Sequence, residues 1–151
     1  MGRFEIVIRS AASRDAPTLC SLAAELGYPA STEDMAARLD CLLEVPGHGV
    51  LVAEYAGAGI IGWVHVFGAY RVESDPCAEI GGLVVAERYR GNGAGARLVN
   101  AAEKWAAENG FGTLKVRCRK ERNGAHAFYE SLGFACSKTQ KVFERSVKGD
   151  P

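Results

Sequence analysis

The chain has 151 residues, 18 basic and 18 acidic side chains, and 48% hydrophobic residues. This length predicts a single domain over 1–151 that buries about 70% of its unfolded surface. The zero formal charge gives no reason to expect a nucleic-acid or anionic-membrane partner, and no apolar run approaches the roughly 18 residues of a membrane-spanning helix.

The cysteines and the first five residues indicate the cellular compartment in which the protein works. The five cysteines are odd in number and form no C-x-x-C pair, which argues against a disulfide scaffold or a zinc site. Residues 1–5 are too polar for a signal peptide. We therefore expect a cytoplasmic protein that holds no metal.

Hydrophobic periodicity and turn residues predict the elements in chain order. They are a strand 5–9, helices 15–26 and 31–45, a hairpin of strands 50–55 and 60–67, a polar loop 69–76, a buried strand 80–85, a helix 94–108, a strand 113–118, a helix 124–132 and one or two strands within 134–147. Strands followed by a β-α-β-α-β order predict an α/β (α+β) fold with a mixed, mostly antiparallel sheet.

A glycine-dense turn joins the buried strand 80–85 to the helix that follows it. Free N–H groups and the helix dipole favour an anion at such a helix start, so we expect a ligand that carries phosphates. A P-loop is excluded, because the helix opens Gly95-Ala96-Arg97-Leu98 without Lys or Ser/Thr.

Two other interpretations of the glycines compete. A dinucleotide fingerprint matches at Gly91, Gly93 and Ala96, but five residues separate the strand from the glycines, and the next strand ends in Arg119-Lys120 rather than in an acid. The pattern R-x-x-G-x-G is also met, at Arg90, Gly93 and Gly95.

A second motif lies downstream, where residues 125–134 match A-x-x-[FLY]-Y-x-x-x-G-F. The two motifs, in this order, resemble the acetyl-CoA site and the closing helix of the GNAT superfamily of N-acetyltransferases, over roughly 49–143. The resemblance implies a GNAT-like sheet with helices on both faces. It also implies a splayed central pair of parallel strands, 80–85 and 113–118.

The same resemblance implies acetyl-CoA as the acyl donor, bound without a metal. Strand backbone would pair with the pantetheine arm, and the glycine loop would hold the pyrophosphate. The family often has an Asn seven residues before the motif Tyr; here that position is Arg122, and Asn123 follows it. The expected donor-binding residues are Leu83, Val84, Val85, Arg90, Gly91, Asn92, Gly93, Ala94, Gly95, Ala96 and Asn123.

Direct attack of an amine on the thioester, as the resemblance implies, needs no protein nucleophile but leaves two protons to manage. Tyr129 could donate a hydrogen bond or a proton to the leaving thiolate, or it could serve only in packing. Glu79 could take the amine proton, bind a cationic acceptor or merely end a strand. The general base stays open between Glu79, His65 and a water relay.

We therefore expect an N-acetyltransferase that moves an acetyl group from acetyl-CoA to a primary amine of a small molecule or protein. One alternative is a catalytically silent acyl-CoA-binding regulatory module, and another is a nucleotide-binding domain. The residues do not identify the amine. A homodimer is compatible with the sequence, and no nucleic acid or membrane is expected as a partner.

Overall fold

The computed structural model describes residues 5–149 of the chain. Their contacts divide into two compact units, with the boundary between Arg117 and Cys118. The first unit contains the sheet, three α-helices and two short 3-10 helices (Ser13–Asp15 and Glu87–Tyr89), and the second contains one α-helix and the C-terminal segment. The single domain over 1–151 stays a prediction.

One five-stranded sheet forms the centre of the first unit, in the order β1-β2-β3-β4-β5. The first three junctions are antiparallel, and only β4 and β5 run parallel. The mixed, mostly antiparallel sheet is therefore confirmed. The strands are β1 (Ile6–Ser10), β2 (His48–Tyr55), β3 (Gly59–Arg71), β4 (Ser74–Val85) and β5 (Leu114–Val116).

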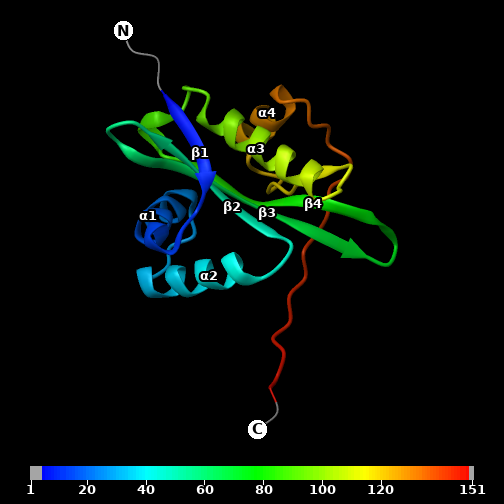
Figure 1. The fold of residues 1–151 in the computed structure, drawn as a ribbon. Helices are drawn as coiled ribbons and strands as arrows, with labels where there is room; N and C mark the ends of the chain where they lie inside the picture. Colours follow the sequence, from blue (N-terminus) through cyan, green and yellow to red (C-terminus); the bar gives the residue numbers. More distant parts are fainter. Residues whose placement is uncertain (1–4, 150–151) are drawn as a thin grey trace. The chain divides into compact units, whose positions relative to one another are not determined.

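Helices cover both faces of this sheet, as expected (Figure 1). The helices α1 (Ala16–Leu26) and α2 (Thr32–Glu44) lie on one face, and α3 (Ala94–Glu108) lies on the other. Successive residues of β3 accordingly face the two sides of the sheet in alternation. Trp63 packs into the apolar cluster of α1 and α2, whereas the Cα of Gly62 faces Leu98 of α3.

Local sequence signals explain the helix ends. The hydroxyl of Ser31 accepts a hydrogen bond from the backbone N–H of Asp34 at 3.0 Å and caps α2. Gly27, at a φ of 100°, ends α1 in the left-handed conformation that glycine adopts without strain. The longest helix, α3, has 15 residues. Among residues 5–149, no helix is long and apolar enough to cross a bilayer.

The polar loop expected over 69–76 was wrong. Strands β3 and β4 continue through this segment as a hairpin, in which Ala69 pairs with Cys77 and Arg71 with Ser74. Ala69 and Cys77 are buried, so the hairpin ladder keeps a core face while its polar residues face solvent. As a consequence Glu79 lies inside β4 and not at its start.

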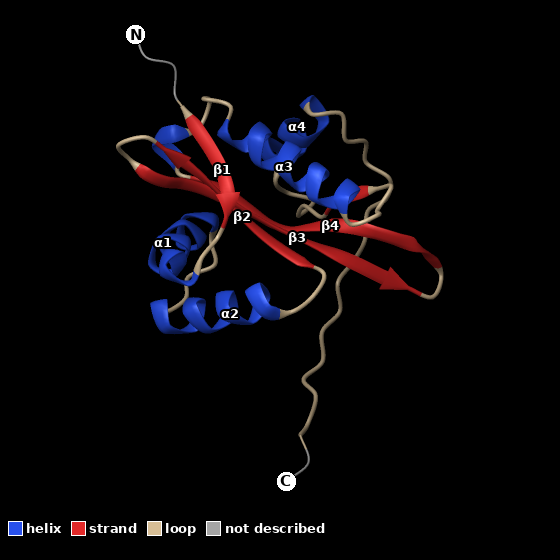
Figure 2. Cartoon of the chain, viewed as in Figure 1, coloured by secondary structure: helices blue, strands red, loops and turns tan. Residues whose placement is uncertain are grey.

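The second unit contains α4 (Asn123–Ser131) and the segment after it. The strands expected within 134–147 were also wrong, because residues 134–149 form no strand or helix (Figure 2). Val142, Phe143 and Val147 in this segment are more than four-fifths exposed. A strand needs a partner ladder for its backbone groups, and apolar periodicity does not supply one.

Candidate functional site

The centre of the site is the place where β4 and β5 separate. Their parallel pairing covers only three residue pairs, from Ala78–Leu114 to Ile80–Val116. β4 then continues to Val85, while β5 ends at Val116. The edge of β4 over 81–85 has no strand partner on the β5 side among the described residues, so its backbone groups are available to an extended ligand. This is the splayed parallel pair that we expected, although among the described residues β5 lies at the edge of the sheet and not at its centre.

Burial along β4 changes at the same point. The four residues Cys77–Ile80 are buried, and Gly81 directly after them is exposed although it lies inside the strand. A register shift between β3 and β4 falls here, because His65 pairs with Gly82 while the next residue, Val66, pairs with Ile80. Gly81 is therefore the extra residue of a β-bulge, a device that often re-aims groups beside active sites.

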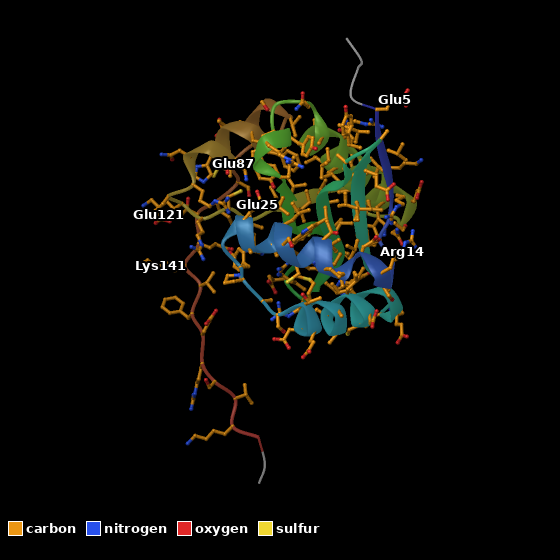
Figure 3. All side chains as sticks on the ribbon, turned by 90° about the vertical axis from the view of Figure 1, so that its left-hand side faces the viewer. Glu5, Arg14, Glu25, Glu87, Glu121 and Lys141 are labelled. Atoms are coloured by element: carbon orange, nitrogen blue, oxygen red, sulfur yellow. The ribbon has the colours of Figure 1, made fainter. Side chains whose placement is uncertain are left out.

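The turn after β4 is fixed by hydrogen bonds at both ends. The backbone N–H of Ala86 donates to the carbonyl of Ile61 at 2.7 Å, and the Nε of Arg90 donates to the carbonyl of Val85 at 3.1 Å. The carboxylate of Glu25, on α1, accepts from the backbone N–H of Glu87 at 3.1 Å (Figure 3). The strand end, the turn and α1 are thus tied together.

The glycine loop leads directly into α3, as the sequence predicted. Gly91 and Gly93 have φ angles of 84° and 83°, in the left-handed region that favours glycine. The first turn of α3 closes with the N–H of Arg97 donating to the carbonyl of Gly93 at 3.0 Å. The backbone N–H groups before Arg97 therefore have no partner within the helix. The first turn also contains no acidic residue, which suits an anionic ligand.

The remaining expected donor-site residues lie on β4, in the glycine loop and, in the second unit, on α4. Leu83 and Val85 are half-buried and Val84 is buried. The side-chain amide of Asn92 donates to the carbonyl of Tyr89 at 3.1 Å and stiffens the loop. Asn123 is the first residue of α4 and is exposed.

Glu79 is buried and carries two arginine partners. Arg71, near the end of β3, lies 3.1 Å from Oε1 of Glu79, and Arg117, just after β5, lies 3.3 Å from the same oxygen. Burial raises the pKa of this carboxyl, but the hydrogen bonds and charges of Arg117 and Arg71 outweigh burial and lower it overall. A carboxylate held in this way is a weak proton acceptor, and it offers little net negative charge to a cationic acceptor.

His65 lies on β3, and the side chain of His48 on β2 is its hydrogen-bond partner. Its Nε2 lies 3.0 Å from Nδ1 of His48, the first residue of β2. Burial, and then the charge of His48, lower the pKa of His65 to about 4. The ring is therefore neutral at pH 7 and keeps a lone pair for hydrogen bonding.

Tyr129 lies on α4, in the second unit, between the rings of Phe128 and Phe134. Burial and the neighbouring Cys118 raise the pKa of its hydroxyl to about 12, against a smaller lowering by Arg122. Proton transfer from this group to a thiolate is therefore less favourable than an ordinary tyrosine would allow, whereas hydrogen-bond donation is retained.

Comparisons with known proteins agree with this geometry. Residues 15–134 match the acetyltransferase (GNAT) family model. The chain belongs to this family. Membership of the family places it among the acyltransferase enzymes.

Individual relatives extend the comparison. The chain is 29% identical over 124 residues to an aminoglycoside N(6')-acetyltransferase type 1 of Serratia marcescens, covering 79% of this chain and 84% of that protein. Two other curated relatives match over shorter stretches, and the chain spans only 22% and 34% of their lengths.

Solved structures share the fold. An aminoglycoside antibiotic 6'-N-acetyltransferase from Acinetobacter baumannii superposes with a TM-score of 0.85 at 18% identity, over 95% of this chain and 100% of that one. The aminoglycoside N-acetyltransferase AAC(6')-Iy in complex with CoA gives 0.83 at 18% identity, over 95% of both chains. These likenesses confirm the GNAT fold.

Three residues of the site were missed from the sequence. Arg71 reaches Glu79 from β3, Arg117 reaches it from the residue after β5, and His48 reaches His65 from β2. Arg71 lay in a segment interpreted as loop, so its position beside Glu79 had no local signal. The hairpin 50–55 with 60–67 did carry a signal for His48, because extending that ladder by two pairs places His48 opposite Phe67 of the second strand.

Proposed function

We propose that the protein transfers an acetyl group from acetyl-CoA to a primary amine, with direct attack of the amine on the thioester. The observation that carries this proposal is the unpartnered edge of β4 over 81–85, which runs into the free N–H groups at the start of α3. An extended pantetheine arm needs strand-like backbone partners, and its pyrophosphate needs converging N–H groups. Both lie here in consecutive order.

In this proposal each donor-site residue has a physical task. Backbone groups of Leu83, Val84 and Val85 pair with pantetheine. Arg90 and Asn92 hold the loop in shape while the amides of residues 91–96 bind the pyrophosphate. Asn123 adds a polar contact to the pantetheine arm, as the family resemblance implies.

The proposed chemistry assigns Tyr129 to the leaving group. Its hydroxyl donates a hydrogen bond to the thiolate as the C–S bond breaks, an interaction that strengthens toward the transition state. We assign Glu79 a positioning role through Arg71 and Arg117 rather than the role of general base, because both arginines already engage its carboxylate.

We propose a small-molecule amine of the aminoglycoside kind as the acceptor. Support comes from the Serratia marcescens relative, which the chain covers over most of its length. The cytoplasmic location and a homodimer stay predictions.

The test is turnover of acetyl-CoA across aminoglycosides, polyamines and peptides with free amino termini, with release of free thiol as the readout. Turnover with an aminoglycoside supports the full proposal. Turnover with another amine alone would overturn the acceptor class. Tight CoA binding with no turnover on any amine would favour the catalytically silent module, and binding of ATP or NAD in place of CoA would overturn the donor.

A further inference from the structure

Two histidines form a hydrogen-bonded, stacked pair on the face of the sheet that α1 and α2 cover. Nδ1 of His48 lies 3.0 Å from Nε2 of His65, and the ring centroids are 5.2 Å apart at an interplanar angle of 15°. The ring of Phe67 packs beside both of them. The two rings are thus held in one arrangement by cross-strand contacts.

The second nitrogen of His65 faces the bulge of β4. A Cβ built on Gly81 would lie only 2.7 Å from Nδ1 of His65. The glycine therefore lets the ring edge approach the backbone where β5 stops pairing and β4 becomes exposed. One nitrogen of His65 is directed at the proposed thioester site, and the other is bonded to His48.

We propose that His65 and His48 form a proton relay, which carries the proton of the acceptor amine away from the bulge of β4 to water at His48. This inference deepens the proposed function and rests on it. It names the route of the amine proton, which the fold alone leaves open.

The relay conserves protons and charge at each step. As the amine nitrogen forms the new C–N bond, its N–H gives a proton to Nδ1 of His65. Nε2–H of His65 gives its proton to Nδ1 of His48, and Nε2–H of His48 gives its proton to water. The C–S bond breaks, and its electron pair leaves with sulfur. Exchange with water then resets both rings.

The charges around His65 suit a relay better than a lone base. His48, on β2, is the ionisable group that acts on His65, and together with burial it lowers the pKa of His65 to about 4. A group that passes a proton on as it receives one need not carry a positive charge. His48 is half-buried, so water can take the proton from it.

Other charged groups near this face are already engaged. On β4, Glu79 lies opposite Phe67 and is held by Arg71 and Arg117. On α1, the carboxylate of Glu25 accepts from the backbone N–H of Glu87. On α2, the carboxylate of Asp40 accepts from the hydroxyl of Ser13. These bonds direct the carboxylates to partners other than the histidine pair.

The substitution that tests the relay is His48→Asn. An asparagine amide can replace Nδ1 of the ring as a hydrogen-bond partner, but it cannot pass a proton on. We expect kcat at pH 7 to fall about a hundredfold, the size typical of general acid–base catalysis, with little change in acetyl-CoA affinity. The matched control is His126→Gln, which keeps a donor for the bond from Nε2 to the carbonyl of Arg119. The control should keep wild-type kcat.

A second variant separates proton transfer from a merely structural role. In His48→Ala, added imidazole should restore at least about a tenth of the lost kcat, because His48 lies at the part-exposed end of the relay. Rescue in this variant supports the relay even if His48→Asn folds poorly. Absence of rescue overturns the relay.

The outcomes distinguish this inference from the proposed function. If wild type turns over an amine and His48→Asn keeps its kcat and pH profile, the relay is wrong while the acetyltransferase stands. If wild type turns over no amine, the proposed function fails and the relay fails with it.

Discussion

Arg90 donates a hydrogen bond from its Nε to the backbone carbonyl of Val85, at 3.1 Å. This bond joins the motif arginine to the last residue of β4, the strand that supplies the proposed pantetheine edge. The guanidinium therefore does two things at once. It closes the turn between the strand and the glycine loop, and it leaves its other N–H groups beside the proposed pyrophosphate.

Replacing Arg90 should weaken acetyl-CoA binding. We expect Arg90→Gln to raise the dissociation constant about tenfold, through the lost charge and the loosened turn. The effect should shrink as salt rises, because exposed charges are screened. Calorimetry with CoA at two salt concentrations measures this. Arg88→Gln, which removes the same charge from the same turn, is the control, and equal losses in both variants would contradict a specific role for Arg90.

Gly93 offers a test of the loop itself. Gly93→Val forces a β-branched residue into a φ of 83°, although a Cβ there meets no atom within 4 Å. The cost is conformational, about 1–2 kcal/mol. Gly110→Val is the matched control, since Gly110 has a φ of 84°, the same open space, and a place after the other end of α3.

Both glycine variants should lose similar stability in urea unfolding, but only Gly93→Val should lose CoA affinity. The reason is that a side chain and altered amide directions disturb the N–H groups only at the start of α3. Equal CoA affinity in the two variants would show that the phosphates bind elsewhere.

The hydroxyl of Tyr129 should contribute to kcat and not to the binding of acetyl-CoA. We expect Tyr129→Phe to lower kcat by about tenfold to a hundredfold with unchanged acetyl-CoA affinity, because the interaction strengthens in the transition state. The pKa of about 12 adds a pH test. Wild type should show no loss of activity from Tyr129 ionisation up to about pH 10. Tyr55→Phe serves as the control, and a kcat for Tyr129→Phe equal to wild type would leave Tyr129 a packing role.

The sequence predicted the structure best where an element depends on residues that are neighbours in the chain. The bounds of α3 were predicted to the residue, because Gly93 in the left-handed conformation starts it and Asn109 caps its end. The glycine loop followed from the same kind of signal. The polar segment 69–76 was misread as loop because strand pairing there depends on Cys77 and Ala69, which face the core across the hairpin.

Contacts between residues that are far apart in the sequence could not be predicted from the sequence. Glu79 was singled out from the sequence, but its chemistry depends on Arg71 and Arg117, whose approach is set by the arrangement of the strands. The strands expected after Phe134 show the opposite failure. Apolar residues in a segment do not make it an edge strand, since pairing requires a neighbour.

Glu79→Gln tests both the stability and the chemistry of the cluster. The pKa of Glu79 is lower in the folded protein than in the unfolded chain. Its ion pairs therefore stabilise the fold above the unfolded pKa of about 4.3, and this contribution is lost as pH falls through the folded value. The variant should lose about 1–2 kcal/mol at pH 7, a modest figure because both arginines are partly exposed.

The pH dependence of this loss gives the decisive measurement. Urea unfolding at pH 7 and at about pH 3 should show a smaller gap between wild type and Glu79→Gln at the acid pH, where protonation removes the wild-type advantage. Glu103→Gln, at an exposed site on α3, should show little difference at either pH. In turnover, Glu79→Gln should lower kcat through the displaced arginines and leave the rising limb of the pH profile in place. A shift of that limb would return Glu79 to the role of general base.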